Sequence, residues 1–133
     1  MQEIPSITLG RGSLKALESI IKGYLRNLRK AAARPEIHRK RLKKGALTVS
    51  DQMRILEALH QQFTSLLLRN EQELENVAVL LTVEEIRAIT LALSGFLRGV
   101  KERAPATLER EAILREVAAL RQQLVSMLAH YGT

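Results

Sequence analysis

Residues 13–33 read SLKALESIIKGYLRNLRKAAA, and this stretch decides the fold class. Apolar residues recur there at alternating steps of three and four, the spacing that places them on one face of an α-helix. The series is Leu14, Leu17, Ile21, Tyr24 and Leu28. Because Ser13 precedes the series and serine is a favourable N-cap, we expect a first helix from Ser13 to about Ala33.

The same spacing continues along the chain, which is rich in the strong helix formers Leu, Ala, Glu, Gln and Arg. Further series comprise Leu56, Leu59, Phe63 and Leu66, then Ile86, Ile89, Leu93, Phe96 and Val100, and finally Ile113, Val117, Leu120, Leu124, Met127 and Tyr131. We find no alternating run of β-branched residues. The sequence therefore predicts an all-α fold, a helical bundle of about five helices with a short basic linker helix.

Prolines and glycines suggest the domain organisation. Pro5, Gly10 and Gly12 break any periodicity, so residues 1–12 are predicted to form an irregular N-terminal arm. Residues 13–133 are predicted to form a single helical-bundle domain. Within it, Pro35 to Lys44 is predicted to be a short helix with few apolar residues, which rests on the bundle or is ordered by a partner.

Two interpretations fit residues 50–81. One is a single long helix with the polar Asn70 in its apolar series. The other, which we favour, is two helices with a break near Arg69 and Asn70, where acidic residues start a new first turn. Thr48 or Ser50 is expected to cap the helix that begins this region.

Two later helix starts are marked by capping residues. Thr82 to Glu85 has the pattern of a capping box, with the Glu85 carboxylate able to reach the Thr82 amide. Pro105 and Thr107 are expected to open the last helix.

Composition excludes several classes of protein. A chain of 133 residues with 46% hydrophobic and 26% charged residues suits one folded domain. The absence of Cys excludes disulfides, a thiol nucleophile and Cys-ligated zinc. No signal-peptide pattern and no membrane-spanning apolar run are found, so a cytoplasmic protein without a membrane span is expected.

The net charge of +7 is concentrated in the basic segment, residues 15–44. This segment has eleven basic residues and two acidic ones, whereas residues 45–133 have a net charge of −2. The basic residues are Lys15, Lys22, Arg26, Arg29, Lys30, Arg34, Arg39, Lys40, Arg41, Lys43 and Lys44. We take all eleven as candidate nucleic-acid-binding residues.

Helical geometry gathers part of this charge on one surface. At about 100° per residue, four basic residues of the first helix fall within roughly 60° of one another, largely away from its apolar face. They are Lys15, Lys22, Arg26 and Arg29. Clustered like charges repel, and a polyanion such as a nucleic-acid backbone relieves that repulsion.

Other interpretations of the basic segment stay open. It is either a solvated surface that aids solubility, or a docking site for an acidic protein or an anionic membrane. All four aromatic residues occupy apolar series and are predicted to lie in the core, which leaves no platform for base stacking. A helix-turn-helix over residues 83–100 is disfavoured, because the apolar series runs through Ser94 and Gly95 without a turn.

No catalytic or metal-binding motif is supported. Glu57 and His60 have the Glu-x-x-His spacing of di-iron bundles, but the second copy that such a site needs is missing. Glu84 and Glu85 could suggest an acidic metal-binding cluster, but helix capping already explains them. The segment from Gly10 to Ser13 lacks the Lys and the preceding strand that a phosphate-binding loop needs. We therefore expect a protein that is not an enzyme and that uses no metal or cofactor.

Two functional hypotheses follow. In the first, the protein contacts a DNA or RNA backbone through its basic surface, as a small accessory subunit of a nucleoprotein assembly. In the second, it is an adaptor or an oligomerising protein whose last helix pairs with another chain, while its basic segment docks an acidic partner or only solubilises the chain.

Overall fold

The computed structural model describes residues 5–33, 47–69 and 76–131. In chain order the elements are β1 (Ser6–Gly10), α1 (Arg11–Ala32), α2 (Val49–Arg69), β2 (Asn76–Leu80), α3 (Val83–Arg103) and α4 (Leu108–Tyr131). The described residues are mostly helical, as predicted, but they form four helices and a two-stranded sheet instead of about five helices. The predicted short helix from Pro35 to Lys44 lies outside the described residues.

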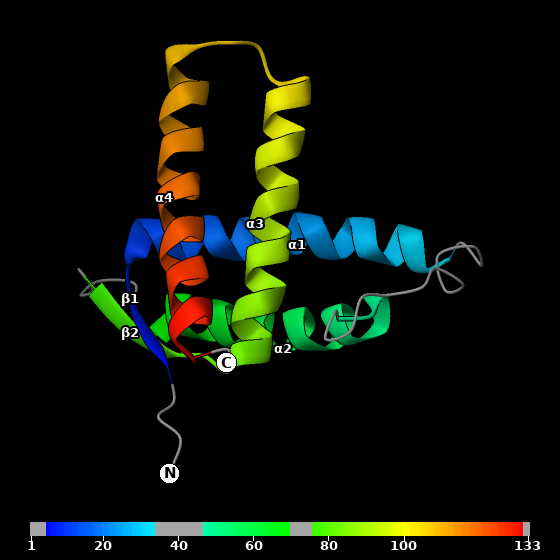
Figure 1. The fold of residues 1–133 in the computed structure, drawn as a ribbon, viewed down its shortest axis with the longest axis vertical. Helices are drawn as coiled ribbons and strands as arrows, with labels where there is room; N and C mark the ends of the chain where they lie inside the picture. The colour runs from blue at the N-terminus through cyan, green and yellow to red at the C-terminus, as the bar shows by residue number, and fades with distance from the viewer. Residues whose placement is uncertain (1–4, 34–46, 70–75, 132–133) are drawn as a thin grey trace.

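The helices are arranged as two crossing pairs (Figure 1). Helices α1 and α2 pack side by side, and the α3–α4 hairpin crosses them. The first half of α3 packs against both α1 and α2, while its second half extends beyond them together with the start of α4. From this crossing the second half of α1 and the second half of α3 run in different directions (Figure 1).

The two strands correct two predictions. Residues 6–10 form a strand and not part of an irregular arm, and they pair antiparallel with residues 76–80, from Ser6 opposite Leu80 to Gly10 opposite Asn76. Residues 76–80 are thus a strand where we predicted a helix. The physical reason is alternation: Ile7 and Leu9 are buried while Ser6 and Thr8 are exposed, which suits a strand with one face on the core.

Helix α1 begins earlier than predicted. It starts at Arg11 directly after β1, and its N-cap is Gly10, which makes no side-chain capping hydrogen bond. Ser13 is therefore inside the helix. A glycine cap costs little relative to serine, and the strand before it already fixes where the helix can begin.

The other helix starts follow the predicted capping residues. At α2, the Thr48 hydroxyl accepts a hydrogen bond from the Asp51 amide at 3.0 Å. At α3, the Thr82 hydroxyl accepts from the Glu85 amide at 3.1 Å, and the Thr82 amide donates to the Glu85 carboxylate at 2.8 Å, which completes the predicted capping box. Thr107 caps α4 in the same way.

Two further predictions about helix continuity are tested. Helix α2 ends at Arg69 and β2 begins at Asn76, so a single long helix over residues 50–81 is excluded, but the strand at residues 76–80 stands where the favoured interpretation had a second helix. Helix α3 is continuous from Val83 to Arg103, which excludes a helix-turn-helix over residues 83–100.

The core contains one face of every helix and the inner face of the sheet. Phe63, Ile21 and Leu93 are fully buried at its centre. In α4 most of the predicted series is confirmed, since Val117 and Leu124 are buried and Leu120 and Met127 pack against the core. At the start of the helix the prediction is wrong, because Leu114 is buried and Ile113 is 46% exposed.

The helix glycines provide the first testable prediction. A Cβ atom added at Gly23 or Gly99 would meet no atom within 4 Å, so Gly99→Ala should raise the unfolding free energy by about 0.5–1 kcal/mol through helix propensity alone. A Cβ at Gly95 would lie 3.3 Å from Cε2 of Tyr24, whose hydroxyl is itself held by Gln52. Gly95→Ala should therefore lose that gain or destabilise. Urea unfolding of both variants tests this, and equal stabilisation by both would contradict it.

Candidate functional site

Helix α1 has three distinct faces, and they organise the site. Its core face buries Leu14, Leu17, Ile20, Ile21, Leu25 and Leu28 against α2, α3 and β1. A second face is turned toward the second half of α3 and lines a groove with it. The third face carries cationic side chains into water, and we call it the cationic face.

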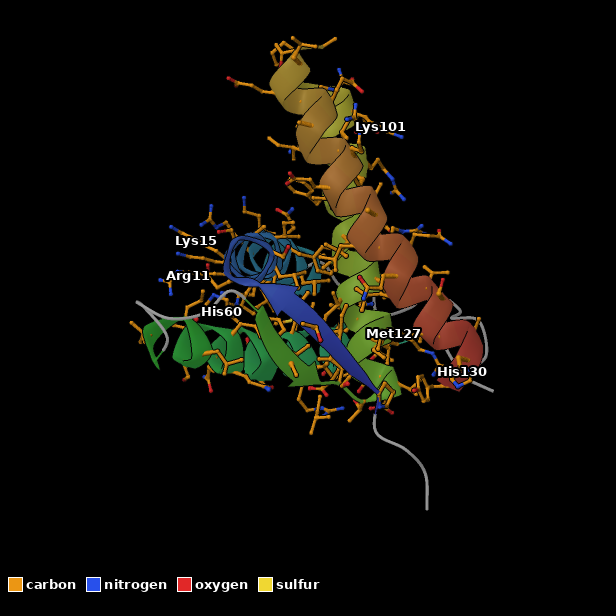
Figure 2. All side chains as sticks on the ribbon, turned by 90° about the vertical axis from the view of Figure 1, so that its left-hand side faces the viewer. Arg11, Lys15, His60, Lys101, Met127 and His130 are labelled. Atoms are coloured by element: carbon orange, nitrogen blue, oxygen red, sulfur yellow. The ribbon has the colours of Figure 1, made fainter. Side chains whose placement is uncertain are left out.

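The cationic face holds most of the predicted site residues that the structure describes. Lys15, Lys22, Arg26 and Lys30 are all exposed. None of them has an ion-pair partner in the described part of the chain. Figure 2 shows Arg11 and Lys15 on the side of α1 that points away from α3 and α4. Three of the four residues of the predicted stripe, Lys15, Lys22 and Arg26, thus form an exposed surface on a helix whose opposite face is fixed in the core. The fourth, Arg29, is exposed but paired with α2.

Helix α2 modifies the edge of this surface through two contacts. Arg29 pairs with Glu57 at 3.2 Å, but both side chains are about half exposed, so the pair contributes little stability and can open. Glu18, the only acidic residue in α1, is bonded to His60 of α2 at 2.8 Å, and both side chains are mostly buried. The one acidic group in the helix is thus turned from the cationic face toward α2.

The remaining candidates cannot be placed by the structure. Arg34, Arg39, Lys40, Arg41, Lys43 and Lys44 lie outside the described residues. Their assignment as binding residues stays a prediction from the sequence.

Sequence reasoning missed a second group of cations. Arg98, Lys101 and Arg103 are exposed on the second half of α3, the half that extends past α1. The acidic residues elsewhere in residues 45–133 outweigh this local group and give that whole region a net charge of −2. A window of six residues, 98–103, would have shown three basic residues against one acidic residue at a helix end.

A groove of about 680 Å³ lies in the corner between α1 and α3. Its lining is Ser19, Ile20, Gly23, Tyr24, Arg26, Asn27, Ala92, Gly95, Phe96, Gly99, Val100, Arg103 and Ala104. Most of these residues are apolar or very small. Among the described residues, the charged side chains that line it are Arg26, from α1, and Arg103, from α3.

The aromatic residues are less uniformly buried than the sequence predicted. Phe63 is fully buried, whereas Tyr24, Phe96 and Tyr131 are only partly buried. Tyr24 and Phe96 line the groove. The prediction that all four aromatic residues lie in the core is therefore confirmed only for Phe63.

Tyr24 of α1, which lines the groove, contacts both α2 and α3. Its hydroxyl donates to Oε1 of Gln52 at 2.9 Å, and Nε2 of the buried Gln52 donates to the Leu47 carbonyl at 3.1 Å. The other side of the Tyr24 ring approaches Gly95 of α3. Burial raises the pKa of the Tyr24 hydroxyl above its ordinary value, and the positive charge of Arg98 lowers it in part.

The residues considered for metal binding face different partners. Glu57 contacts Arg29 and His60 contacts Glu18, so the Glu-x-x-His pair does not converge on one point. Glu85 is engaged in the capping box of α3. Within residues 5–33, 47–69 and 76–131, no three His, Asp or Glu side chains are grouped to hold a metal ion.

Comparison of the chain with protein-family models, with curated proteins and with solved structures gives no match. Among the described residues, no helix has both the length and the apolar character needed to cross a membrane. What the fold and the site define is a class of architecture: two crossing helix pairs with a cationic helix face on one side and an arginine-rimmed groove beside it.

The Tyr24 hydrogen bond provides the second testable prediction. Because the pKa of Tyr24 is raised in the folded state, its contribution to stability is complete below the ordinary tyrosine pKa of about 10 and is lost as the pH rises above it. Tyr24→Phe removes the hydroxyl and leaves Oε1 of buried Gln52 without this donor, which should cost about 1–2 kcal/mol at pH 8.

Urea unfolding of both proteins at pH 8 and at pH 11 checks this. The wild-type advantage over Tyr24→Phe should shrink at the higher pH. An advantage that is absent at pH 8, or that grows at pH 11, would contradict the assigned hydrogen bond.

Proposed function

We propose that this protein binds the phosphate backbone of a nucleic acid through the cationic face of α1, as a small accessory subunit of a nucleoprotein assembly. The observation that carries the proposal is the set of exposed cations on that face, Lys15, Lys22, Arg26 and Lys30, which have no ion-pair partner among the described residues. The basic residues between 34 and 44 follow directly in sequence and extend the proposal to the rest of the basic segment.

The geometry of the face suits a polyanion. From Lys15 to Lys30 the helix rises about 22 Å, and its core face holds the backbone rigid while the lysine and arginine side chains can adjust. Each phosphate neutralised by such a cation releases condensed counterions, which supplies affinity that falls with salt. Side-chain contacts of this kind position a protein on a backbone but read little sequence.

A second candidate function is oligomerisation through helical surfaces. In the form predicted from the sequence, Leu120 and Leu124 would pair with another chain. Leu124 is 1% exposed and packs inside its own chain, so that part of the surface is already used. Oligomerisation is favoured instead by two other features, the groove between α1 and α3 and the exposed Ile113 of α4.

The third prediction concerns salt dependence. Binding to duplex DNA and to RNA should weaken steeply with salt, and replacing Lys15, Lys22 and Lys30 with Gln should reduce the slope of log K against log [salt] by about one unit for each lysine that contacts a phosphate. The measurement is fluorescence anisotropy of labelled oligonucleotides over a series of salt concentrations.

A matched control removes three charges elsewhere. Arg54, Lys101 and Arg115 are exposed on α2, α3 and α4, and changing them to Gln gives the same net charge as the first variant. The control should keep most of the wild-type slope. Equal losses in both variants would reduce the effect to net charge alone, and the absence of binding at low salt by the wild-type protein would overturn the proposal.

A further inference from the structure

The groove between α1 and α3 has the shape of a site for another helix. Its lining runs along α3 from Ala92 to Ala104, a rise of about 18 Å, or more than three helical turns. The space above Gly23 and Gly99 is empty, since an added Cβ atom at either position would meet nothing within 4 Å. Glycines on both walls allow an incoming side chain to reach close to the two backbones.

The charge of the groove restricts its occupant. Arg26 and Arg103 stand one on each wall, and no acidic residue of the described ranges lines the groove. Arg98, exposed on the same half of α3, adds further positive charge near the groove, close enough for its charge to lower the pKa of Tyr24. A fitting occupant therefore presents an apolar side chain to the floor and carboxylates to the rim.

The start of α4 presents such a surface. At about 100° per residue, Glu109, Ile113 and Glu116 fall within roughly 60° of one another, beside the core face of the helix. All three are exposed, with Ile113 46% exposed. Neither glutamate has an ion-pair partner in the described part of the chain. The two carboxylates are about 10 Å apart along the helix axis, with the isoleucine between them.

We propose that the groove receives the Glu109, Ile113 and Glu116 surface of a second copy of this chain, with the isoleucine over the glycines and the carboxylates at Arg26 and Arg103. Each copy carries both the groove and the complementary helix surface, so the contact can be made twice around a two-fold axis. The result is a dimer in which the start of each α4 covers the partner's groove. This inference shares Arg26 with the cationic face of α1. Lys15, Lys22 and Lys30 do not line the groove, so replacing those lysines tests the proposed nucleic-acid binding separately from the dimer.

A nucleobase is the alternative occupant of the groove. Much of the lining is Gly, Ala, Ile and Val, which offer no side-chain hydrogen-bond partners to a base, but Ser19, Asn27, Tyr24 and Phe96 also line it and supply polar and aromatic groups. The charge complementarity between the two arginines and the two glutamates is what favours the helix of a second copy. Nucleic-acid binding in the groove is therefore the competing outcome of the test.

The fourth prediction tests the dimer by charge exchange in the full chain. One variant carries Arg26→Glu and Arg103→Glu, and the other carries Glu109→Lys and Glu116→Lys. Each variant alone places like charges together at both contacts, whereas a mixed dimer restores opposite charges at both. In sedimentation velocity, the wild-type protein should be dimeric, each variant alone monomeric, and the equimolar mixture dimeric again.

Two single variants test the apolar part of the contact from its two sides. Gly99→Leu fills the groove where the structure has open space, and Ile113→Ser removes an exposed side chain, so both should keep the helical far-ultraviolet circular dichroism of the wild-type protein. Both should be monomeric. A monomeric wild-type protein, or charge variants that remain dimeric, would overturn the proposal. So would a Gly99→Leu protein that stays dimeric but loses affinity for single-stranded oligonucleotides, because that result would assign the groove to nucleic acid.

Discussion

The structure depends on the packing of one face of α1 while the opposite face stays in water. Six leucine and isoleucine side chains of this helix are buried, and each such burial contributes about 2 kcal/mol of transfer free energy. The strand before α1 and the helices α2 and α3 all pack against it. Because the core face is held from several directions, the exposed cations of the same helix have a fixed direction in space.

Polar contacts set how the neighbouring helices sit on α1. Glu18 and His60 link α1 to α2, and the Tyr24 hydroxyl links α1 to Gln52 near the start of α2. Gly95 of α3 lies against the Tyr24 ring, where an added Cβ atom would come within 3.3 Å of Cε2. These contacts hold α2 and α3 against α1, and the groove lies between α1 and α3 where the two helix pairs cross (Figure 1).

Local sequence patterns predicted the helices and most of their caps. They failed where contacts between residues far apart in the chain determine the structure. Capping at Thr48, Thr82 and Thr107 was correct because a cap depends on residues three positions apart. The β2 strand was missed because a short apolar segment suits either a helix or a strand, and its partner β1 is about seventy residues away in the chain. At the start of α4 the core residue was misassigned because two adjacent positions are apolar, and packing against α3 selects Leu114 over Ile113.

The candidate site shows the same division. Exposure of Lys15, Lys22 and Arg26 follows from helical periodicity alone, so the sequence was sufficient. The groove could not be predicted, because it is formed by two helices that are far apart in the chain and cross in space. The role of Glu18 was likewise hidden, since its partner His60 comes from another helix.

The central claim is that the cationic face of α1 is the surface that meets a polyanion, and lysine footprinting tests it most directly. Acetylation of the folded protein, read by mass spectrometry with and without duplex DNA or RNA, reports the accessibility of each lysine. The account predicts that nucleic acid protects Lys15, Lys22 and Lys30, while Lys101, near the far end of the α3–α4 hairpin, stays reactive (Figure 2). Protection of Lys101 with no protection of the α1 lysines would contradict it.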